Sequence, residues 1–502
     1  MSEAAAGLDR SKFTLDVSGI AGVLGGEESF AAMSSVHLMR GRRWLGLYNS
    51  PGSYYVAKKY GTLAQFPLWK GLFPGPPVEP AAMLELDSKS GPRYMGVESG
   101  TRLPTTGHLA YLLARYCDRK VQPIERPVPE PAPMPTIVAP APTLPGLRTS
   151  YPPVSPSSPY PTSPSPTSTT NFLLRNRSPK RSSTVGTITS AKPPPKVIVT
   201  IVKLGNFKEW PNYPIVPEEF FSQFNAWGFV PTIATISFAI GAAIARDWFS
   251  FAMIFLGALC NGVSCYIIGS GELRIHCRKP SPSSPPGDGI LVNDGHIIIL
   301  QGDEHMVSHV IRGRYHLHYN SSPQYMDIGF CSFLLTAQFI VQLFLVPQGM
   351  LFGQIMFLAT FVVSWGFNAY LASVDRDTLQ TNVLLQALGN PEFMKLDFDK
   401  WYAAAAFVAC YLHPDTLEEL VPNKTPAWNI CRSLTLKAIA EDRNPTNLLL
   451  EKEGQIALNG LSKPSEREFV EEFIERAAQA YNGAKVIKNR NVIPTPAHWH
   501  SK

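Results

Sequence analysis

Histidines are concentrated in one part of this 502-residue chain: six of its eleven fall within residues 271–325. His305 and His309 stand four residues apart, which places two side chains on one face of a helix, and His316 and His318 would share one face of a strand. Zinc sites use both spacings. No cysteine or carboxylate is placed convincingly to complete the ligand set, and the acidic residues before His305 more simply begin a helix. We predict a polar, pH-responsive surface, with no metal and these four histidines as weak candidate ligands.

Asp375 and Asp377 form a second candidate pair, in the sequence VDRD. Sugar-nucleotide enzymes hold a divalent cation through acidic residues at this spacing. The simpler interpretation is a helix start, because acidic side chains favour helix N-termini. The chain has no P-loop, GxGxxG, GxSxG or HExxH motif. The sequence therefore predicts no enzyme, no cofactor and no catalytic residue.

The segments that position these residues are long and uncharged. Residues 328–374 contain no charged side chain. As one helix they would be roughly 70 Å long, whereas a bilayer core is about 30 Å thick, so two spans joined by a turn near residue 348 are predicted. Residues 220–245 and 248–271 are two further uncharged runs, separated by two charged residues. A large soluble helical core is the alternative, but four runs of span length favour the membrane.

The predicted fold class is an α-helical integral membrane protein with two transmembrane helical hairpins, four spans in all. It also has a small α+β cytosolic insertion, a disordered Pro/Ser-rich segment and a helical C-terminal region. The predicted boundaries are a small α+β N-terminal region (1–120), the linker (121–196), a strand with a juxtamembrane segment (197–227), the first hairpin (228–270, spans 228–245 and 249–269), the α+β cap (271–325), the second hairpin (326–372, spans 327–346 and 350–371) and the C-terminal region (373–502).

Local signals predict elements in the soluble segments. An Asn-Asp-Gly turn predicts a hairpin, and a Ser-x-x-Glu capping box predicts a helix start at Ser465. Residues 401–412 are too short to span and are predicted to form a buried or interfacial helix. The predicted strands are residues 196–204, 289–292, 296–300 and 314–319, together with strands and turns in VHLMRGRRWLGLYNSPGSYYVAKKYGTL (36–63), and the predicted helices are residues 107–120 and a short one from residue 303.

The linker holds 20 of the 46 prolines within residues 123–196. Prolines recur every third residue at 153, 156 and 159, the period of one face of a polyproline II helix. A plain linker is the favoured interpretation and a ligand for an SH3- or WW-type domain is the alternative. Five Ser-Pro sites suggest phosphorylation: Ser155, Ser158, Ser163, Ser165 and Ser178.

The polar groups inside the predicted spans are neutral. Ion-coupled transporters usually need an ionisable residue in the membrane, and these spans have none. Amides, together with the glycines at 257, 262 and 353, are typical of helix packing in lipid, whereas a path lined by these amides in a homo-oligomer is the alternative. The predicted packing or pore-lining residues are Asn261, Gln338, Gln342, Gln354 and Asn368.

The distribution of charged residues predicts the orientation of the chain in the membrane. Four spans place the N-terminal region, the central loop and the C-terminal region on one side, and the central loop is rich in Arg and Lys whereas the opposite turns carry one Arg. The positive-inside rule then predicts cytosolic N- and C-termini. The net charge of +6 suits an anionic leaflet and gives no evidence of nucleic-acid binding. Seven cysteines without a CxxC pair favour reduced thiols.

Four phrases carry a family resemblance: PPGDGIL, IRGRYHLHY, VPQGMLFGQIMFLATFVVSWGFNAYL and ELVPNKTPAW. Together they resemble a group of polytopic membrane proteins of fungi, over roughly residues 220–440. The resemblance implies a membrane location and a fungal origin, and it carries no site residues.

The favoured function is a membrane-anchored interaction or scaffold protein. Its predicted partners are the lipid bilayer and proteins that bind the Pro-rich segment or the C-terminal helices. The alternative is a subunit of an oligomeric small-solute channel or transporter. A third hypothesis is an enzyme that uses the histidines or the aspartate pair.

Overall fold

A computed structural model of the chain describes residues 25–39, 41–119, 196–205, 222–276, 281, 283–293 and 295–492. Four helices in it are long and apolar enough to cross a membrane. They indicate a multi-pass membrane protein, as predicted, and form two sequential pairs: α8 (Ser222–Ile244), α9 (Trp248–Ile268), α11 (Met326–Leu345) and α12 (Leu351–Ser373). The predicted linker, except for residue 196, lies outside the described residues.

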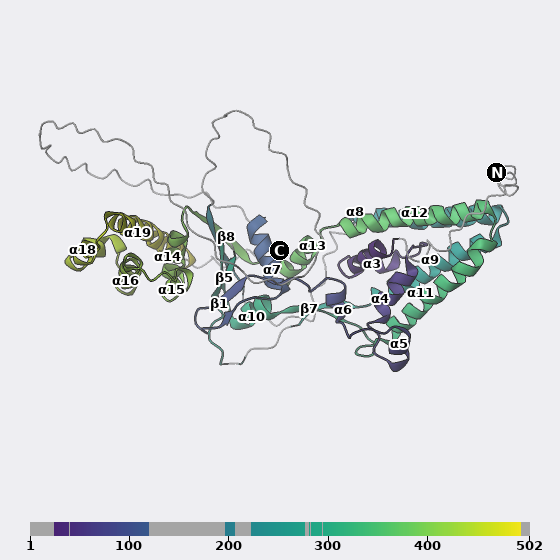
Figure 1. Cartoon of the computed structure of the whole chain (residues 1–502), viewed down its shortest axis with the longest axis horizontal. Helices are drawn as coiled ribbons and strands as arrows, with labels where there is room; N and C mark the ends of the chain where they lie inside the picture. Colours follow the sequence, from purple (N-terminus) through teal and green to yellow (C-terminus); the bar gives the residue numbers. More distant parts are fainter. Residues whose placement is uncertain are drawn as a thin grey trace, which may run out of the picture. The chain divides into compact units, whose positions relative to one another are not determined.

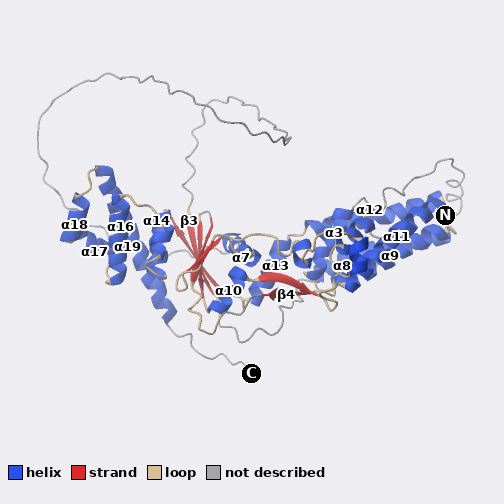
Figure 2. Ribbon diagram, turned by 60° about the horizontal axis from the view of Figure 1, so that its bottom comes forward, coloured by secondary structure: helices blue, strands red, loops and turns tan. Residues whose placement is uncertain are grey.

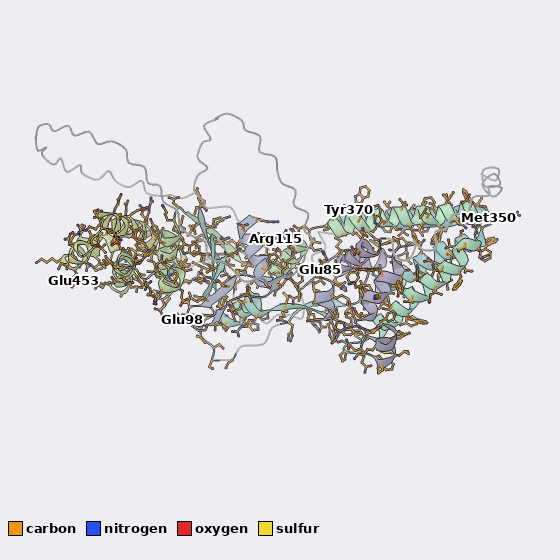
Figure 3. All side chains as sticks on the ribbon, viewed as in Figure 1. Glu85, Glu98, Arg115, Met350, Tyr370 and Glu453 are labelled. Carbon is orange, nitrogen blue, oxygen red and sulfur yellow. The ribbon has the colours of Figure 1, made fainter. Side chains whose placement is uncertain are left out.

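The outer faces of these helices remain apolar. Ile233 of α8, Phe344 of α11 and Val362 of α12 are each more than half exposed. Met350 and Tyr370 lie at opposite ends of α12, which carries side chains outward along its length (Figure 3). Large exposed apolar side chains are costly in water and favourable in lipid, so these faces fit contact with acyl chains.

The turns of the two helix pairs contact each other through a buried carboxylate. Asp247 begins α9 and accepts hydrogen bonds from Ser250 N (3.1 Å) and from Ser250 Oγ (2.7 Å). Its Oδ2 also accepts from Met350 N, at 2.8 Å, in the turn before α12. A Cβ on Gly353 would lie 1.9 Å from Asp247 Oδ2, so only glycine allows this approach. The side chain thereby satisfies backbone donors at the ends of two helices.

A six-stranded mixed sheet forms the centre of the soluble part (Figure 2). Its order is β2-β1-β5-β6-β3-β8, with β3 and β6 parallel and the other neighbouring pairs antiparallel. The predicted strands at 196–204, 289–292 and 296–300 are confirmed. The strands are β1 (Arg93–Gly96), β2 (Arg102–Leu103), β3 (Val197–Lys203), β5 (Gly289–Asn293), β6 (His296–Gln301) and β8 (Glu392–Phe398); β4 (Glu272–His276) and β7 (Arg314–His318) form a separate antiparallel pair.

Alternate side chains of the central strands enter two different cores. Ile297 and Ile299 of β6 pack toward α14 (Trp401–Tyr411), whereas Ile298 and Leu300 pack toward the other face. The two central strands, β3 and β6, therefore present apolar side chains to both cores. The second face is covered by α7 (His108–Arg119), α10 (Glu304–Arg312) and α13 (Arg376–Ala387).

The sheet requires its strands to lie on one side of the membrane. β3 precedes α8 and α9, and β5 and β6 follow them. The pair α11 and α12 lies between β6 and β8 in the same way. Since β3 pairs with both β6 and β8, each helix pair must return the chain to the side from which it started. The central loop thus contributes two strands to a sheet built from four segments of the chain.

Residues 25–61 do not join this sheet. We call them the insert; it contains α3 (Gly26–Ser34) and α4 (Ser53–Gly61), with two 3-10 turns (Ser35–His37 and Arg42–Trp44) between them. α3 packs on α12, α4 packs on α11, and both helices lie between these two spans (Figure 1). The N-terminal region is therefore shared between the membrane bundle and the soluble part, with α5 (Pro67–Leu72) and α6 (Pro80–Met83) after the insert.

The strands predicted for residues 36–63 are wrong. Ser53, Val56, Ala57, Tyr60 and Gly61 are the buried residues of α4, and they recur with the 3.6-residue period of a helix. Val36, Val56 and Tyr60 of this stretch instead pack in a core with residues of α9 and α11, whereas Trp44 and Tyr54 are exposed. Tertiary packing decided the local structure here.

The C-terminal region is mostly helical and packs on the sheet through α14. The prediction of a helical region over residues 373–502 did not include β8 (Glu392–Phe398), which joins the sheet. The stripe Phe473, Ala477 and Tyr481 is buried in this core. Ser465 is not the helix cap: the last helix begins at Pro464, and Lys463 O accepts from Glu466 N. Proline suits the first helical position, so the helix begins two residues earlier than a Ser465 cap would allow. The remaining helices are α15 (Thr416–Leu420), α16 (Pro426–Ala440), α17 (Pro445–Leu450), α18 (Lys452–Asn459) and α19 (Pro464–Val492).

We expect Gly257→Ala to destabilise the bundle. A Cβ on Gly257 of α9 would lie 1.9 Å from Asn49 Oδ1 of the insert, and relieving such overpacking typically costs about 1–3 kcal/mol. Gly366→Ala on α12 is the matched control, since a Cβ there meets nothing within 4 Å. In thermal unfolding in detergent, the Gly257→Ala variant should have a lower melting temperature than the Gly366→Ala variant. Equal melting temperatures would contradict the placement of the insert.

Candidate functional site

The insert reaches the middle of the spans at Asn49. Its Nδ2 donates to Thr360 Oγ1 at 2.8 Å, and its backbone N donates to Thr235 Oγ1 at 3.3 Å. Thr360 is the tenth of the 23 residues of α12, and Gly257, which faces Asn49, is the tenth of the 21 residues of α9. Two spans therefore place this asparagine near mid-depth in the bundle.

Side chains of the bundle satisfy the irregular backbone between α3 and α4. Asn261 Nδ2 donates to Gly46 O at 2.8 Å, and Ser29 Oγ donates to Pro51 O at 2.9 Å. Non-helical backbone is tolerated at membrane depth only where protein or enclosed water supplies its hydrogen bonds. The neutral polar residues of the spans thus have a structural role that their sequence alone did not reveal.

A chain of hydrogen bonds runs from a buried arginine toward α4. Arg42 is 4% exposed, and its guanidinium donates to Leu45 O (2.9 Å) and to Tyr48 Oη (3.0 Å). Tyr48 Oη donates to Asn368 Oδ1 at 2.8 Å. Asn368 Nδ2 then donates to the hydroxyl oxygens of Ser29 (2.9 Å) and Ser50 (3.1 Å).

Arg42 also lies over the ring of Phe367, with its Cζ 5.2 Å from the centroid. Within the part of the chain that the structure describes, no carboxylate forms an ion pair with it. Its Nε has no hydrogen-bond partner there either. A buried cation of this kind leaves a net positive charge in a low-dielectric interior.

Several buried polar atoms near Asn49 have no partner among the described residues. They are Ser53 Oγ, Asn49 Oδ1, Gln338 Oε1 and both amide atoms of Gln342. A small cavity lies beside them, with a volume of about 10 Å³ for the centre of a water molecule, which is space for one water-sized species. The residues that line it are Ser29, Met33, Ser50, Pro51, Ser53, Val56, Asn261, Leu335 and Gln338.

The five amides singled out in the spans thus have different surroundings. Asn261 and Asn368 bind the insert, and Gln354 Nε2 donates to Val346 O and Gly349 O in the turn before α12. Gln338 and Gln342 lie on the face of α11 toward the cavity and Asn49, and the described residues offer their unpaired atoms no partner. The serines Ser155, Ser158, Ser163, Ser165 and Ser178 lie outside the described residues.

Sequence reasoning missed the insert, although a signal for it exists. Residues 44–57 contain no charged side chain, but 14 residues are too few to span a bilayer. Uncharged runs of this length are typical of re-entrant segments, which enter the membrane and return to the same side. Arg42 and Tyr48 were not singled out because neither belongs to a recognised motif.

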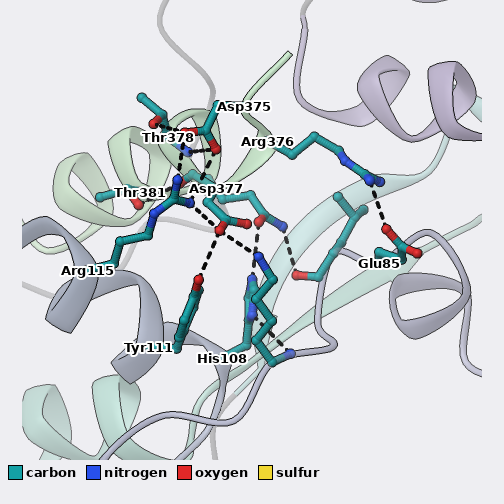
Figure 4. Close-up of polar contacts among 12 residues, drawn as sticks. Glu85, His108, Tyr111, Arg115, Asp375, Arg376, Asp377, Thr378 and Thr381 are labelled. Carbon is teal, nitrogen blue, oxygen red and sulfur yellow. Dashed lines mark hydrogen bonds and ion pairs between the residues drawn. The ribbon is translucent and has the colours of Figure 1, made fainter. Parts of the chain in front are cut away.

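Asp375 and Asp377 take part in a cluster of ion pairs (Figure 4). Arg115 of α7 pairs with both carboxylates, and Lys89 Nζ lies 2.6 Å from Asp377 Oδ2. Asp375 also caps α13 by accepting from Thr378 N, and it accepts from Thr378 Oγ1 at 3.0 Å. Because two cations already balance the pair, the structure favours a helix start over a divalent-cation site. This cluster joins α13, which follows the last span, to α7 and the sheet.

The four candidate zinc ligands lie on two elements. On α10, the rings of His305 and His309 are 4.3 Å apart between centroids, and His309 Nδ1 lies 2.6 Å from His305 O. On β7, His316 Nδ1 lies 2.8 Å from Glu79 Oε1, and His318 pairs across the ladder with Glu272. The described residues contain no group of three or more His, Cys, Asp or Glu placed to hold a metal ion.

No family model, no curated protein and no solved structure matches the chain. The resemblance to fungal polytopic membrane proteins therefore stays a prediction, and the argument for function rests on the geometry.

The buried histidine of the sheet gives a prediction about pH. His296 Nε2 lies 2.8 Å from Thr200 Oγ1, and burial lowers the pKa of His296 to about 4. The unfolded chain, with a pKa near 6.5, binds a proton first as the pH falls, so stability present above pH 6.5 is lost down to about pH 4. The loss is at most about 3.5 kcal/mol, at about 1.4 kcal/mol per pKa unit.

We expect His296→Gln to flatten the fall in unfolding temperature between pH 6.5 and pH 4. His413→Gln, at an exposed histidine, is the control and should keep the wild-type slope. An unchanged slope in the His296 variant would show that another group dominates acid unfolding.

Proposed function

We propose that the chain is a membrane-anchored interaction protein that holds a folded platform at the cytosolic surface of a membrane. The observation that carries this proposal is the six-stranded sheet, whose strands come from before, between and after the two helix pairs. A platform built in this way is fixed to the spans at several points along the chain.

Short connections support a fixed platform. Only residues 269–271 separate α9 from β4, and residues 374–375 separate α12 from α13. The ion pairs of Arg115 with Asp375 and Asp377 then hold α13 against α7. Single exposed ion pairs contribute little, but this cluster shares carboxylates between two cations and a helix cap. Proteins that bind the Pro-rich segment or the C-terminal helices remain the proposed partners.

The filled bundle favours an anchor over a solute path. The space between α11 and α12 holds α3 and α4 (Figure 1). Two span asparagines, Asn261 and Asn368, donate hydrogen bonds to the insert. Two span threonines, Thr235 and Thr360, accept hydrogen bonds from it. Lining a pore would leave such groups free to contact water and solute.

The topology can be tested with a specific protease site placed after Ser284 or after Gly460. Both positions lie in the soluble part, and we expect cleavage at both in sealed vesicles whose cytosolic side faces outward. A site at Arg246, in the turn between α8 and α9, is the control and should be cut only after detergent is added. Protection of both soluble sites would contradict the cytosolic orientation, and protection of only one would contradict the shared sheet.

Gln338 and Gln342 favour a second candidate function, a subunit of an oligomeric small-solute channel or transporter. Their partnerless amide atoms lie inside the bundle, where such groups are costly unless they bind something. The anchor proposal expects no flux above empty vesicles when the purified chain is reconstituted and assayed with small neutral solutes.

Flux that disappears in the double variant Gln338→Leu, Gln342→Leu would instead favour the channel. Thr336→Val on the same helix is the control, because Thr336 Oγ1 donates to Ser332 O of its own helix.

A further inference from the structure

We propose that the cavity at the start of α4 binds a small inorganic anion of about the size of chloride. This site is independent of the interaction function proposed above. It lies inside the bundle, between the insert and the spans α9 and α11.

The start of α4 supplies the first attraction for an anion. Ser50, Pro51 and Ser53 line the cavity, and Gly52 is the helix cap with φ of 74°. Among the described residues, no side chain accepts from the first backbone N–H groups of α4, and its first turn has no acidic residue. These unpaired donors carry the positive end of the helix dipole, which favours anions and acts more strongly away from water.

The start of α3 lies directly beside it. A Cβ on Gly52 would be 2.3 Å from Gly26 Cα, so the two helix N-termini converge. Glu27 and Glu28 in the first turn of α3 offset part of the positive potential of that helix. The proposal therefore depends on α4, and Ser29 of α3 contributes to the lining of the cavity.

Two buried side chains in the cavity wall lack partners, and this is the independent sign of a ligand. Ser53 is 5% exposed and Gln338 is 2% exposed, and Ser53 Oγ and Gln338 Oε1 have no hydrogen-bond partner among the described residues. A hydroxyl and a side-chain amide both carry donors, and an amide can exchange its oxygen and nitrogen by a flip. Both can therefore donate to an anion between them.

The hydrogen-bond chain from Arg42 adds positive potential and orients the nearby hydroxyl groups. Asn368 Nδ2 donates to the oxygens of Ser29 and Ser50, which occupies lone pairs on both. Ser29 uses its own hydrogen for Pro51 O, while the contact of Ser50 with that carbonyl is long, at 3.4 Å. The Ser50 hydroxyl also lies 3.2 Å from Ser29 Oγ, which can accept its hydrogen.

The volume of the cavity and the sign of the electrostatic potential in it determine which class of ligand can bind. The cavity holds one water-sized species, and a chloride ion is only slightly larger than water. A cation would face the positive end of the α4 dipole, which opposes it.

Thermal unfolding of the full chain in nanodiscs of neutral lipid tests the proposal. Sodium chloride or sodium bromide is titrated against sodium gluconate at constant ionic strength. We expect a saturable rise in the unfolding temperature with either halide, because a ligand that binds only the folded state stabilises it. The apparent halide affinity should fall at least tenfold in Ser53→Ala. Ser264→Ala is the control, since Ser264 Oγ donates to Cys260 O of its own helix.

Equilibrium dialysis with radiolabelled chloride provides a second measurement that does not depend on unfolding. We expect one saturable site per chain in the wild type and in Ser264→Ala, and none in Gln338→Glu, whose carboxylate repels the anion. The same halide response in the wild type and Ser53→Ala would overturn the proposal. So would the absence of any saturable chloride binding in the wild type, which would mean that the cavity holds water only.

Discussion

The bundle depends on one constraint: every backbone polar group at membrane depth must find a partner within the protein. The backbone groups of the spans are paired within their own helices. The segment between α3 and α4 is irregular and cannot pair its backbone groups in this way. Asn261 therefore donates to its backbone, Thr235 accepts from its backbone, and Asn49 anchors it to Thr360. The glycine at 257 gives this asparagine room. Polar residues and glycines in the spans thus follow from the backbone that they surround.

The soluble part is organised by a different constraint, the pairing of strands that are distant in sequence. β3 and β6 are buried on both faces, so each needs a helical layer above and below. Segments from before, between and after the helix pairs supply these layers and strands. This arrangement fixes the membrane topology more firmly than charge counting, because paired strands cannot lie on opposite sides of a bilayer.

Sequence patterns predicted the features that depend on neighbouring residues and missed the contacts between residues that are distant in the chain. The absence of charge over residues 328–374 was enough for two spans, and the Asn-Asp-Gly turn was enough for the hairpin of β5 and β6. The amides in the spans were noticed, but their partners were not, because Gly46 is more than 200 residues from Asn261 and Tyr48 is more than 300 residues from Asn368. The helix α4 was mistaken for strands because short apolar patches between glycines and prolines were given more weight than the helical period of its buried face. The ion pairs of Asp375 and Asp377 depend on Arg115, which no spacing connects to them.

The position of the insert has a consequence for biosynthesis. Residues 25–61 leave the ribosome first, yet their binding surface on α12 is made about 300 residues later. Until then, Asn49 lacks its partner Thr360, and Ser29 and Ser50 lack the amide of Asn368. The hydrogen bonds of the insert are therefore complete only when the last span has been made, and shorter nascent chains expose polar groups that the finished bundle pairs.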